Sequence, residues 1–238
     1  MPYRGDYRGA VLLKAIDSNA GGANYRDEVT AALISLGTPL RAMGVAQEGQ
    51  TLFTVTGRNP LLVELSREGE VLRRIQLKGF SDPEAVEMMD NGRMAIVDER
   101  RRQLTTFTLH DDDLELDAAD LPGFDLGFVD AGNKGFEAVG WDARSSSLML
   151  GKERSPMGLF SLPFPGEDGA AGVMQPFNYD SLGVRDISSL SIDARTGHAL
   201  VLSDESRMLL ELDRSGHPVS FLSLTGGLNG LEQGIKQA

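Results

Sequence analysis

Short apolar runs alternate with polar, glycine-containing turns along most of the chain. The clearest pair of runs is LVELSREG at 62–69 and LLELDRSG at 209–216, which lie 147 residues apart, close to three times 49. Each leads through its glycine turn into a second apolar run, at 71–75 and at 219–224. Glycine readily adopts the positive φ that a tight hairpin turn requires. The pattern predicts β-hairpins that recur with a period of about 50 residues.

A second motif precedes each hairpin and supports the same period. Its copies read PEAV at 83–86, FEAV at 136–139 and ISSL at 187–190, with a weaker copy, RAMG, at 41–44. Each copy is followed by a polar turn and then by a β-rich run that ends in a charged tip, such as DER at 98–100. Repeats of about 50 residues with four short strands are typical of the blades of a β-propeller. A sandwich of two sheets is the alternative, but it does not require a repeated motif.

We therefore predict an all-β fold, a β-propeller built from four-stranded blades. The four copies of the inner-strand motif predict a fifth near residue 239, whereas the sequence ends at Ala238. Either the ring closes with four blades or its last blade is incomplete or missing, and we expect the second. Residues 1–24 are expected to form a linker or tail, and residues 25–238 to form the propeller domain.

Composition limits what such a propeller can bind. The net charge of −12 opposes binding to nucleic acid or to an anionic membrane surface, and the three arginines at 100–102 are expected to lie at a solvated strand end. The absence of cysteine excludes disulfides, thiol nucleophiles and cysteine-ligated zinc. No apolar run approaches the roughly 18 residues of a membrane helix. Contact with a membrane is expected only through a segment that is not present in this chain.

No catalytic motif appears in the sequence. It contains no Gly-x-Ser-x-Gly, no phosphate-binding glycine loop and no His-Glu-x-x-His. The three histidines are His110, His198 and His217, and we interpret them as surface residues rather than as general bases. The sequence therefore predicts no catalytic residue.

Several long strings of the sequence match one family in order. They are LLVELSREGEVLRRIQLKGFSDPEAV, GRMAIVDERRRQL, GNKGFEAVGWD, GKERSP and DISSLSIDARTGHALVLSDESRMLLELDRSG. Together they resemble the SdiA-regulated (YjiK-type) family of bacterial proteins, over about residues 40–238. The resemblance implies a five-bladed propeller distantly similar to NHL-repeat proteins, a bound calcium ion and no established biochemical activity. It also implies a location at the cell envelope, anchored in the membrane on the periplasmic side.

Acidic residues of the inner strands are the candidate metal ligands. Inner strands line the central channel of a propeller, so equivalent residues of different blades converge on one axis. Glu84 and Glu137 occupy equivalent positions, and Asp82 and Asp186 lie close by in the sequence. Calcium takes six to eight oxygen ligands, which several blades could supply together. The predicted metal ligands are Glu84, Glu137, Asp186, Asp98, Glu153 and Asp204.

Two other interpretations of these carboxylates stay open. They can pair with arginines of the blade tips, such as Arg100 and Arg154, or simply be hydrated. The acids of the blade tips can also be solvated turn residues that cap strand ends. These blade-tip acids are Asp98, Glu99, Glu153, Asp204 and Glu205.

The sequence supports two functional hypotheses. The first is a non-catalytic, calcium-binding propeller that acts as a binding or interaction module of the bacterial cell envelope, with an unknown protein or small molecule as its ligand. The alternative is a metal-dependent hydrolase, similar to a lactonase or esterase, in which a calcium ion in the central channel polarises a carbonyl group. The alternative is weakened because none of the inner-strand motifs contains a histidine that could serve as a general base.

Overall fold

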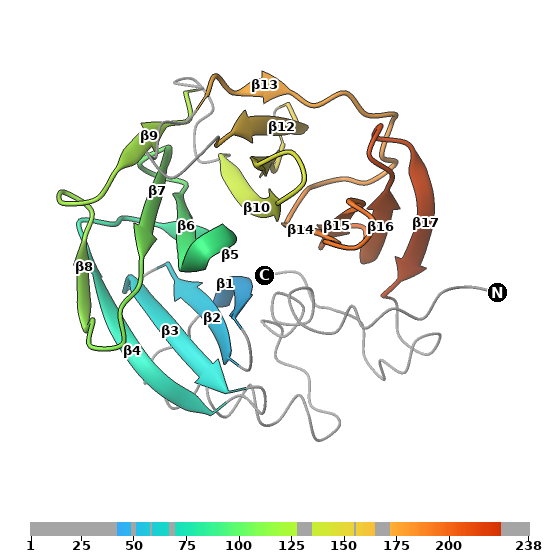
Figure 1. Ribbon diagram of the computed structural model, residues 1–238. Helices are drawn as coiled ribbons and strands as arrows, with labels where there is room; N and C mark the ends of the chain where they lie inside the picture. The colour runs from blue at the N-terminus through green and yellow to red at the C-terminus, as the bar shows by residue number, and fades with distance from the viewer. Residues whose placement is uncertain are drawn as a thin grey trace.

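The computed structural model confirms the predicted β-propeller. It describes residues 42–48, 51–57, 59–66, 70–127, 135–154, 156–164 and 172–224. Within these ranges four separate sheets radiate around a common axis, with their first strands innermost (Figure 1). The two-sheet sandwich is therefore wrong. The predicted linker at 1–24 and the end of the chain, where a further blade is expected to begin, lie outside the described residues.

Each blade is an antiparallel meander that runs outward from the axis. Blade 1 contains β1 (Ala42–Glu48), β2 (Thr51–Thr56), β3 (Leu61–Ser66) and β4 (Val71–Lys78). Blade 2 contains β5 (Pro83–Met88), β6 (Arg93–Asp98), β7 (Gln103–Thr108) and β9 (Gly123–Asp125). Blade 3 contains β10 (Phe136–Asp142), β11 (Ser147–Lys152), β12 (Gly158–Pro163) and β13 (Gln175–Pro176). Blade 4 contains β14 (Ser189–Ile192), β15 (Ala199–Ser203), β16 (Met208–Leu212) and β17 (Pro218–Ser223).

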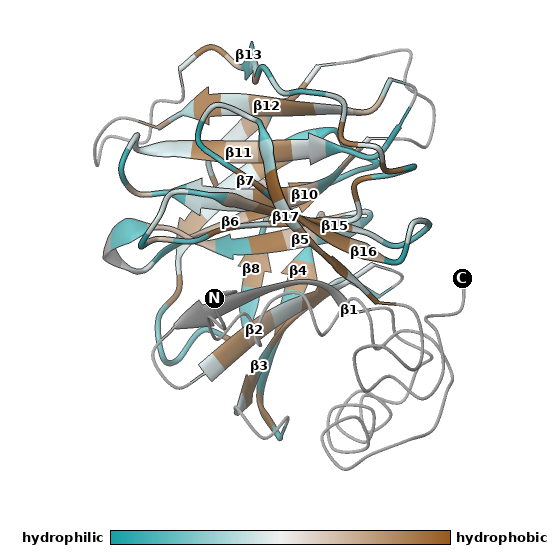
Figure 2. Ribbon diagram, turned by 90° about the vertical axis from the view of Figure 1, so that its right-hand side faces the viewer, coloured by the Kyte–Doolittle hydropathy of each residue, from teal (hydrophilic) through white to brown (hydrophobic). Residues whose placement is uncertain are grey.

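The core is divided into layers between neighbouring blades. Neighbouring residues of β5 belong to different layers, because successive side chains of a strand point to opposite faces of its sheet. Val86 packs with blade 1, and Ala85 packs with blade 3. Both faces of the middle strands are covered in this way, so Met94–Val97 of β6 is fully buried. The apolar colour runs along the strands and the polar colour gathers in the turns (Figure 2).

The first sheet has a fifth strand that the repeat did not predict. β8 (Glu115–Asp117) follows β7 in the sequence but pairs in parallel with β4 of the preceding blade. Its Leu116 is buried in the layer between blades 1 and 2, beside Leu77 and Phe80. Blade 2 thus returns to cover the outer edge of blade 1 before it completes its own fourth strand. The connection from β5 to β6 is a short 3-10 helix, Asp90–Gly92, whose last residue has a φ of +69° that suits glycine.

The inner strands of blades 2 and 3 carry a β-bulge at the same place. In β5 the pairing with β6 shifts between Pro83 and Ala85, and in β10 the pairing with β11 shifts between Phe136 and Ala138. The extra residues are Glu84 and Glu137, which confirms that the two positions are equivalent. A bulge re-aims the side chain of its extra residue. No helix in the described part of the chain is long and apolar enough to cross a membrane.

Candidate metal centre

Three carboxylates meet where the inner strand of blade 2 begins. Asp82 precedes β5, Glu84 is the extra residue of the β5 bulge, and Glu99 lies in the turn between β6 and β7. One ligand oxygen of each lies within 4.8 Å of the others. Glu84 is buried, whereas Asp82 and Glu99 are partly exposed. Among the described residues no other three acidic or histidine side chains come as close together. We call these three residues the acidic cluster.

Asp82 connects the acidic cluster to blade 1 and to an arginine. Its Oδ2 accepts a hydrogen bond from the guanidinium of Arg100 at 3.1 Å, as the blade-tip interpretation predicted. Its Oδ1 lies against Gly57, where a Cβ would come within 2.8 Å of that oxygen. A larger residue at position 57 would therefore displace the carboxylate. The arginine is 68% exposed, so this ion pair is solvated and easily exchanged.

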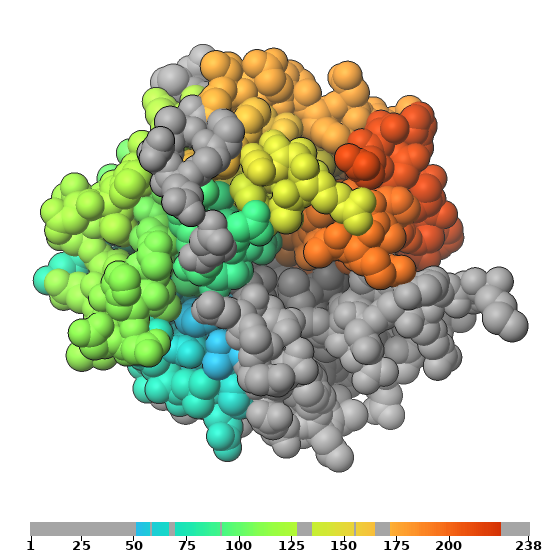
Figure 3. Space-filling view, viewed as in Figure 1, coloured from blue at the N-terminus to red at the C-terminus, as the bar shows by residue number. Residues whose placement is uncertain are grey.

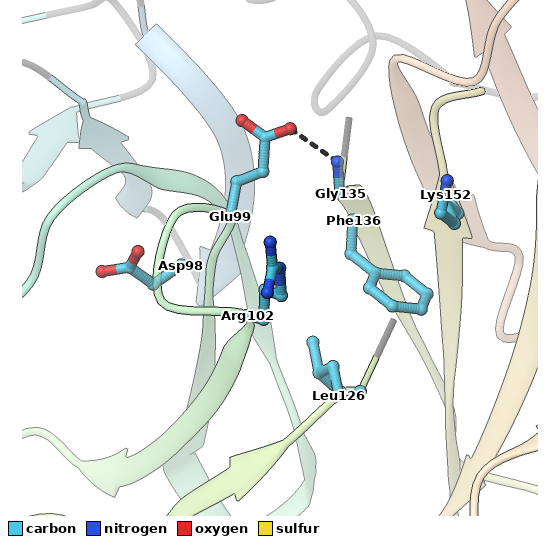
Figure 4. A pocket seen from close by; sticks show the side chains of 8 residues that line it. Asp98, Glu99, Arg102, Leu126, Gly135, Phe136 and Lys152 are labelled. Carbon is cyan, nitrogen blue, oxygen red and sulfur yellow. Dashed lines mark hydrogen bonds between the residues drawn. The ribbon is translucent and has the colours of Figure 1, made fainter. Parts of the chain in front are cut away.

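Glu99 connects the acidic cluster to blade 3. Its Oε1 accepts a hydrogen bond of 2.7 Å from the backbone N–H of Gly135, just before β10 (Figure 4). A small pocket opens beside this contact, between blades 2 and 3. Its accessible volume is about 10 Å³, enough for one water molecule. The lining residues are Asp98, Glu99, Arg102, Leu126, Gly127, Gly135, Phe136 and Lys152.

The geometry of the acidic cluster fits a single hard cation. Calcium–oxygen distances are about 2.3 to 2.6 Å, so oxygens on opposite sides of one ion stand about 5 Å apart. Oxygens that all lie within 4.8 Å of one another satisfy this limit. Three carboxylates at this distance repel one another, and a cation between them would offset the repulsion. Carboxylate donors suit calcium or magnesium rather than metals that prefer sulfur. The cluster could therefore hold a metal ion, with backbone carbonyls or water completing the shell.

Asp98 and Asp186, two of the predicted ligands, hold backbone segments in place. Both oxygens of the buried Asp98 accept backbone N–H bonds, from Ser81 at 2.6 Å, Asp82 at 3.2 Å and Arg101 at 3.0 Å. The buried Asp186 accepts from the Ser203 hydroxyl and from the backbone N–H of Glu205.

The other three predicted ligands also lie outside the acidic cluster. Glu137 occupies the bulge of β10, but the position that corresponds to Asp82 is Gly135 in this blade and offers no carboxylate. Glu153 pairs with Arg154, again as the blade-tip interpretation predicted. Asp204 lies in the turn after β15. Of the six predicted ligands, the structure brings only Glu84 into a cluster that could hold an ion. For the other five, metal binding stays a prediction.

The sequence pattern did not predict Asp82 and Glu99 as ligands. Asp82 was noted beside the inner-strand motif, and Glu99 was interpreted as a solvated tip residue. Both flank residues that were selected, Glu84 and Asp98. A signal was present in the repeat, because only blade 2 has acids at all three positions equivalent to 82, 84 and 99. The alignment of the repeats alone could not show which blade-tip carboxylate points toward the acidic cluster.

Glu87 is a further carboxyl of the inner strand, near the other end of β5. Burial raises its pKa to about 8, and hydrogen bonds from the backbone N–H groups of Met88 and Trp141 offset part of the effect. The bond from Met88 measures 3.0 Å. At neutral pH this carboxyl is therefore largely protonated, in contrast to an ordinary surface glutamate.

The histidines take no part in the acidic cluster. His198 is hydrogen-bonded to Glu211 at 2.8 Å in blade 4, and His217 lies between Asp180 and Asp213 at the surface. His110 is exposed in the loop before β8. None of the three is a ligand or a neighbouring base of the cluster.

Solved structures with the same fold include two functionally different proteins. One is the crystal structure of a nidogen–laminin complex, at 11% identity and a TM-score of 0.53, over 73% of this chain and 61% of that one. Another is a gluconolactonase from Xanthomonas campestris, at 13% identity and a TM-score of 0.53, over 75% of this chain and 61% of that one. This chain thus spans about three fifths of the length of each. At these identities the similarity shows the fold alone.

The family comparison is more specific. A family model described as SdiA-regulated matches residues 19–238, nearly the whole sequence. This range includes all four blades and the acidic cluster, and it confirms the resemblance that the sequence strings indicated. The chain therefore belongs to the SdiA-regulated family.

Proposed function

We propose that this chain is a non-catalytic, calcium-binding β-propeller that serves as an interaction module. The observation that carries the proposal is the acidic cluster of Asp82, Glu84 and Glu99, with its oxygens within 4.8 Å. The ion would stabilise the contact between three blades, because Asp82 lies against Gly57 of blade 1 and Glu99 bonds to Gly135 of blade 3. A rigid propeller with its loops fixed in this way offers a stable surface for a protein or small-molecule ligand.

Calcium titration of the chelator-treated protein tests the metal site. We expect calorimetry to show one binding site and the melting temperature to rise with calcium concentration, since a ligand that binds only the folded state stabilises it. Glu84→Gln should weaken calcium binding at least tenfold, because it removes the buried charged ligand. Glu115→Gln is the matched control: Glu115 is exposed on β8 and pairs with Lys78 at 2.6 Å, so binding should not change.

Two results would contradict the metal proposal. One is a wild-type protein that neither binds calcium nor gains thermal stability from it. The other is equal weakening by Glu84→Gln and Glu115→Gln, which would indicate only a general effect of negative charge. Magnesium in place of calcium distinguishes a calcium-selective site from a general site for divalent cations.

The proposed partners and location follow from charge and family. The net charge of −12 opposes nucleic acid and anionic lipid, so the proposed ligand is a protein or a small molecule. The cell envelope is proposed as the location, with membrane attachment through a segment outside this chain. Fractionation of cells that produce the full-length protein tests the location.

A calcium-dependent hydrolase is the second candidate, and the gluconolactonase fold similarity is the observation that favours it. Two observations weaken it. The pocket beside Glu99 is not lined by Asp82 or Glu84, so it does not lead to the whole acidic cluster. The three histidines also lie away from the acidic cluster. A screen of lactones and esters, with and without calcium, tests this candidate: turnover that Glu84→Gln abolishes would favour the hydrolase over the interaction module.

A further inference from the structure

The outer strands of the four blades differ in how their free edges are protected. In blade 1, β8 pairs with Gln76–Lys78 of β4, and Arg73 donates hydrogen bonds to the backbone carbonyls of His110 and Asp111. In blade 2 the outer strand β9 has only three residues, and in blade 3 the outer strand β13 has two, one of them Pro176. Covering, shortening and proline are the usual ways to prevent an edge strand from pairing with another chain.

β17 of blade 4 has a proline only at its first residue, Pro218, and it is longer than the outer strands of blades 2 and 3. It is six residues long, and no described strand pairs with its outer edge. The segment 217–224, HPVSFLSL, contains no acidic residue, lysine or arginine. Three large apolar side chains of the strand are exposed: Phe221 by 69%, Val219 by 50% and Leu222 by 44%. The strand forms the red, right-hand rim of the molecule (Figure 3). A long, uncharged, apolar edge of this kind favours addition of a further strand.

We propose that β17 pairs edge to edge with β17 of a second copy of this chain. Antiparallel pairing about a two-fold axis joins two identical edges and continues the sheet of blade 4 into the blade of its partner. The charge distribution favours a second copy as the occupant. In a chain with a net charge of −12, two copies can pair along this strand without an acidic residue of one strand opposite an acidic residue of the other.

Charged residues of both signs lie beside the ends of β17. Near its start lie Asp180, whose N–H bonds to Gly216, and Asp213 in the preceding turn. Near its end lie Arg207, whose carbonyl accepts the N–H of Leu224, and Arg185, whose N–H bonds to Ser206. Antiparallel pairing places the start of one strand beside the end of the other. The aspartates of one copy then approach a turn of its partner that carries Arg207 together with Asp204 and Glu205, and Glu205 is already paired with Arg154.

The interface is small, so the dimer is weak and reversible. Each copy contributes one strand edge and three apolar side chains, which is well below the roughly 1,200 Å² of a stable interface. We expect a dissociation constant of about 10 to 100 µM. The association should therefore depend on concentration, and it should be strongest where the protein is confined to a surface.

Sedimentation velocity over a range of about 2 to 200 µM tests the dimer. The wild type should shift from monomer to dimer, and Phe221→Lys should remain monomeric throughout, with Val219→Lys as a second variant. Both changes make the net charge less negative, so loss of the dimer would come from the change within β17 and not from a greater overall repulsion between the two copies. Leu72→Lys is the matched control: Leu72 is 53% exposed on β4 of blade 1, away from β17, and this variant should still dimerise. Circular dichroism verifies that each variant is folded.

Cross-linking tests the geometry directly. Because the chain has no cysteine, Ser220→Cys introduces a single thiol in the middle of β17. A short bis-maleimide should link Ser220→Cys into dimers and leave Leu72→Cys monomeric. The proposal is overturned if the wild type is monomeric at every concentration, which would assign the edge to a different partner or to another segment of the same chain. It is also overturned if Phe221→Lys and Val219→Lys still dimerise, or if both cysteine variants cross-link equally.

Discussion

Blades 2 and 4 have the same strand order but use the start of their inner strands differently. The pairing registers align Ala85 with Ser189, and therefore Asp82 with Asp186 and Glu84 with Ser188. In blade 2, Asp82 and Glu84 belong to the acidic cluster. In blade 4, Asp186 is buried and accepts hydrogen bonds from the Ser203 hydroxyl and the backbone N–H of Glu205. The Ser188 hydroxyl donates to the carbonyl of Leu202 at 3.2 Å.

The difference depends on which residue anchors the loop before the inner strand. In blade 2 the anchor is Asp98 at the end of the second strand, which accepts three backbone N–H bonds and leaves Asp82 beside the channel. In blade 4 that position is Ser203, a hydroxyl that donates to Asp186, so the aspartate itself becomes the anchor. Asp82 can thus belong to the acidic cluster because another carboxylate, Asp98, holds the loop.

The largest expected effect comes from removing the two anchors. Asp98→Ala leaves three buried or half-buried N–H groups without their charged acceptor, and we expect a loss of about 3 to 5 kcal/mol in the free energy of unfolding. Asp186→Ala removes two hydrogen bonds, and we expect about 2 kcal/mol. Urea denaturation measures both. Asp98→Ala should also weaken calcium binding, because Asp82 loses its support, whereas Asp186→Ala should not. Equal losses of stability, or loss of calcium binding in Asp186→Ala, would contradict this division of roles.

How much of this could be predicted from the sequence differs between fold and site. The repeat of about 50 residues and the glycine turns were enough for the propeller, because alternating short strands have few other solutions. The equivalence of Glu84 and Glu137 was also correct. The fifth strand of the first sheet, β8, was not predicted, because a strand that pairs in parallel with the preceding blade has no recognisable pattern in its own sequence. The acidic cluster was predicted only through Glu84, because a bulge and a tip turn set the directions of side chains that lie far apart in the sequence.

A second difference between the two blades concerns Glu87, whose aligned residue in blade 4 is Ser191. Burial raises the pKa of Glu87 to about 8, so the folded protein keeps a proton that the unfolded chain loses above about pH 4.5. Ionisation of Glu87 should therefore cost no stability below about pH 4.5, and the free energy of unfolding should fall as the pH rises toward 8. Glu87→Gln should remove that loss and stabilise the protein at pH 9 by about 2 to 3 kcal/mol, with little change at pH 4.

Thermal or urea unfolding from pH 4 to pH 9 measures this effect. Glu115→Gln is the control, because Glu115 is exposed and its removal should leave the pH dependence unchanged. A wild type whose stability does not fall between pH 5 and pH 8, relative to Glu87→Gln, would show that the packing of β5 against β10 does not keep this carboxyl protonated.

The smallest expected effect tests the exposed arginine of blade 2. Arg100 donates a hydrogen bond to Asp82 at 3.1 Å and must release that oxygen before a cation can bind to it. The aligned Asp186 of blade 4 has no such arginine bond in the described structure; it accepts from a serine hydroxyl and a backbone N–H. An exposed ion pair contributes less than about 1 kcal/mol, so Arg100→Gln should raise calcium affinity about threefold. Arg101→Gln is the control, because it removes the same charge from a side chain that bonds to the carbonyl of Gly79 instead. Calorimetry at low and high salt distinguishes direct competition at Asp82 from general electrostatic repulsion of the cation. If both variants gain calcium affinity equally, Arg100 acts only through its charge, and competition for the Asp82 oxygen is refuted.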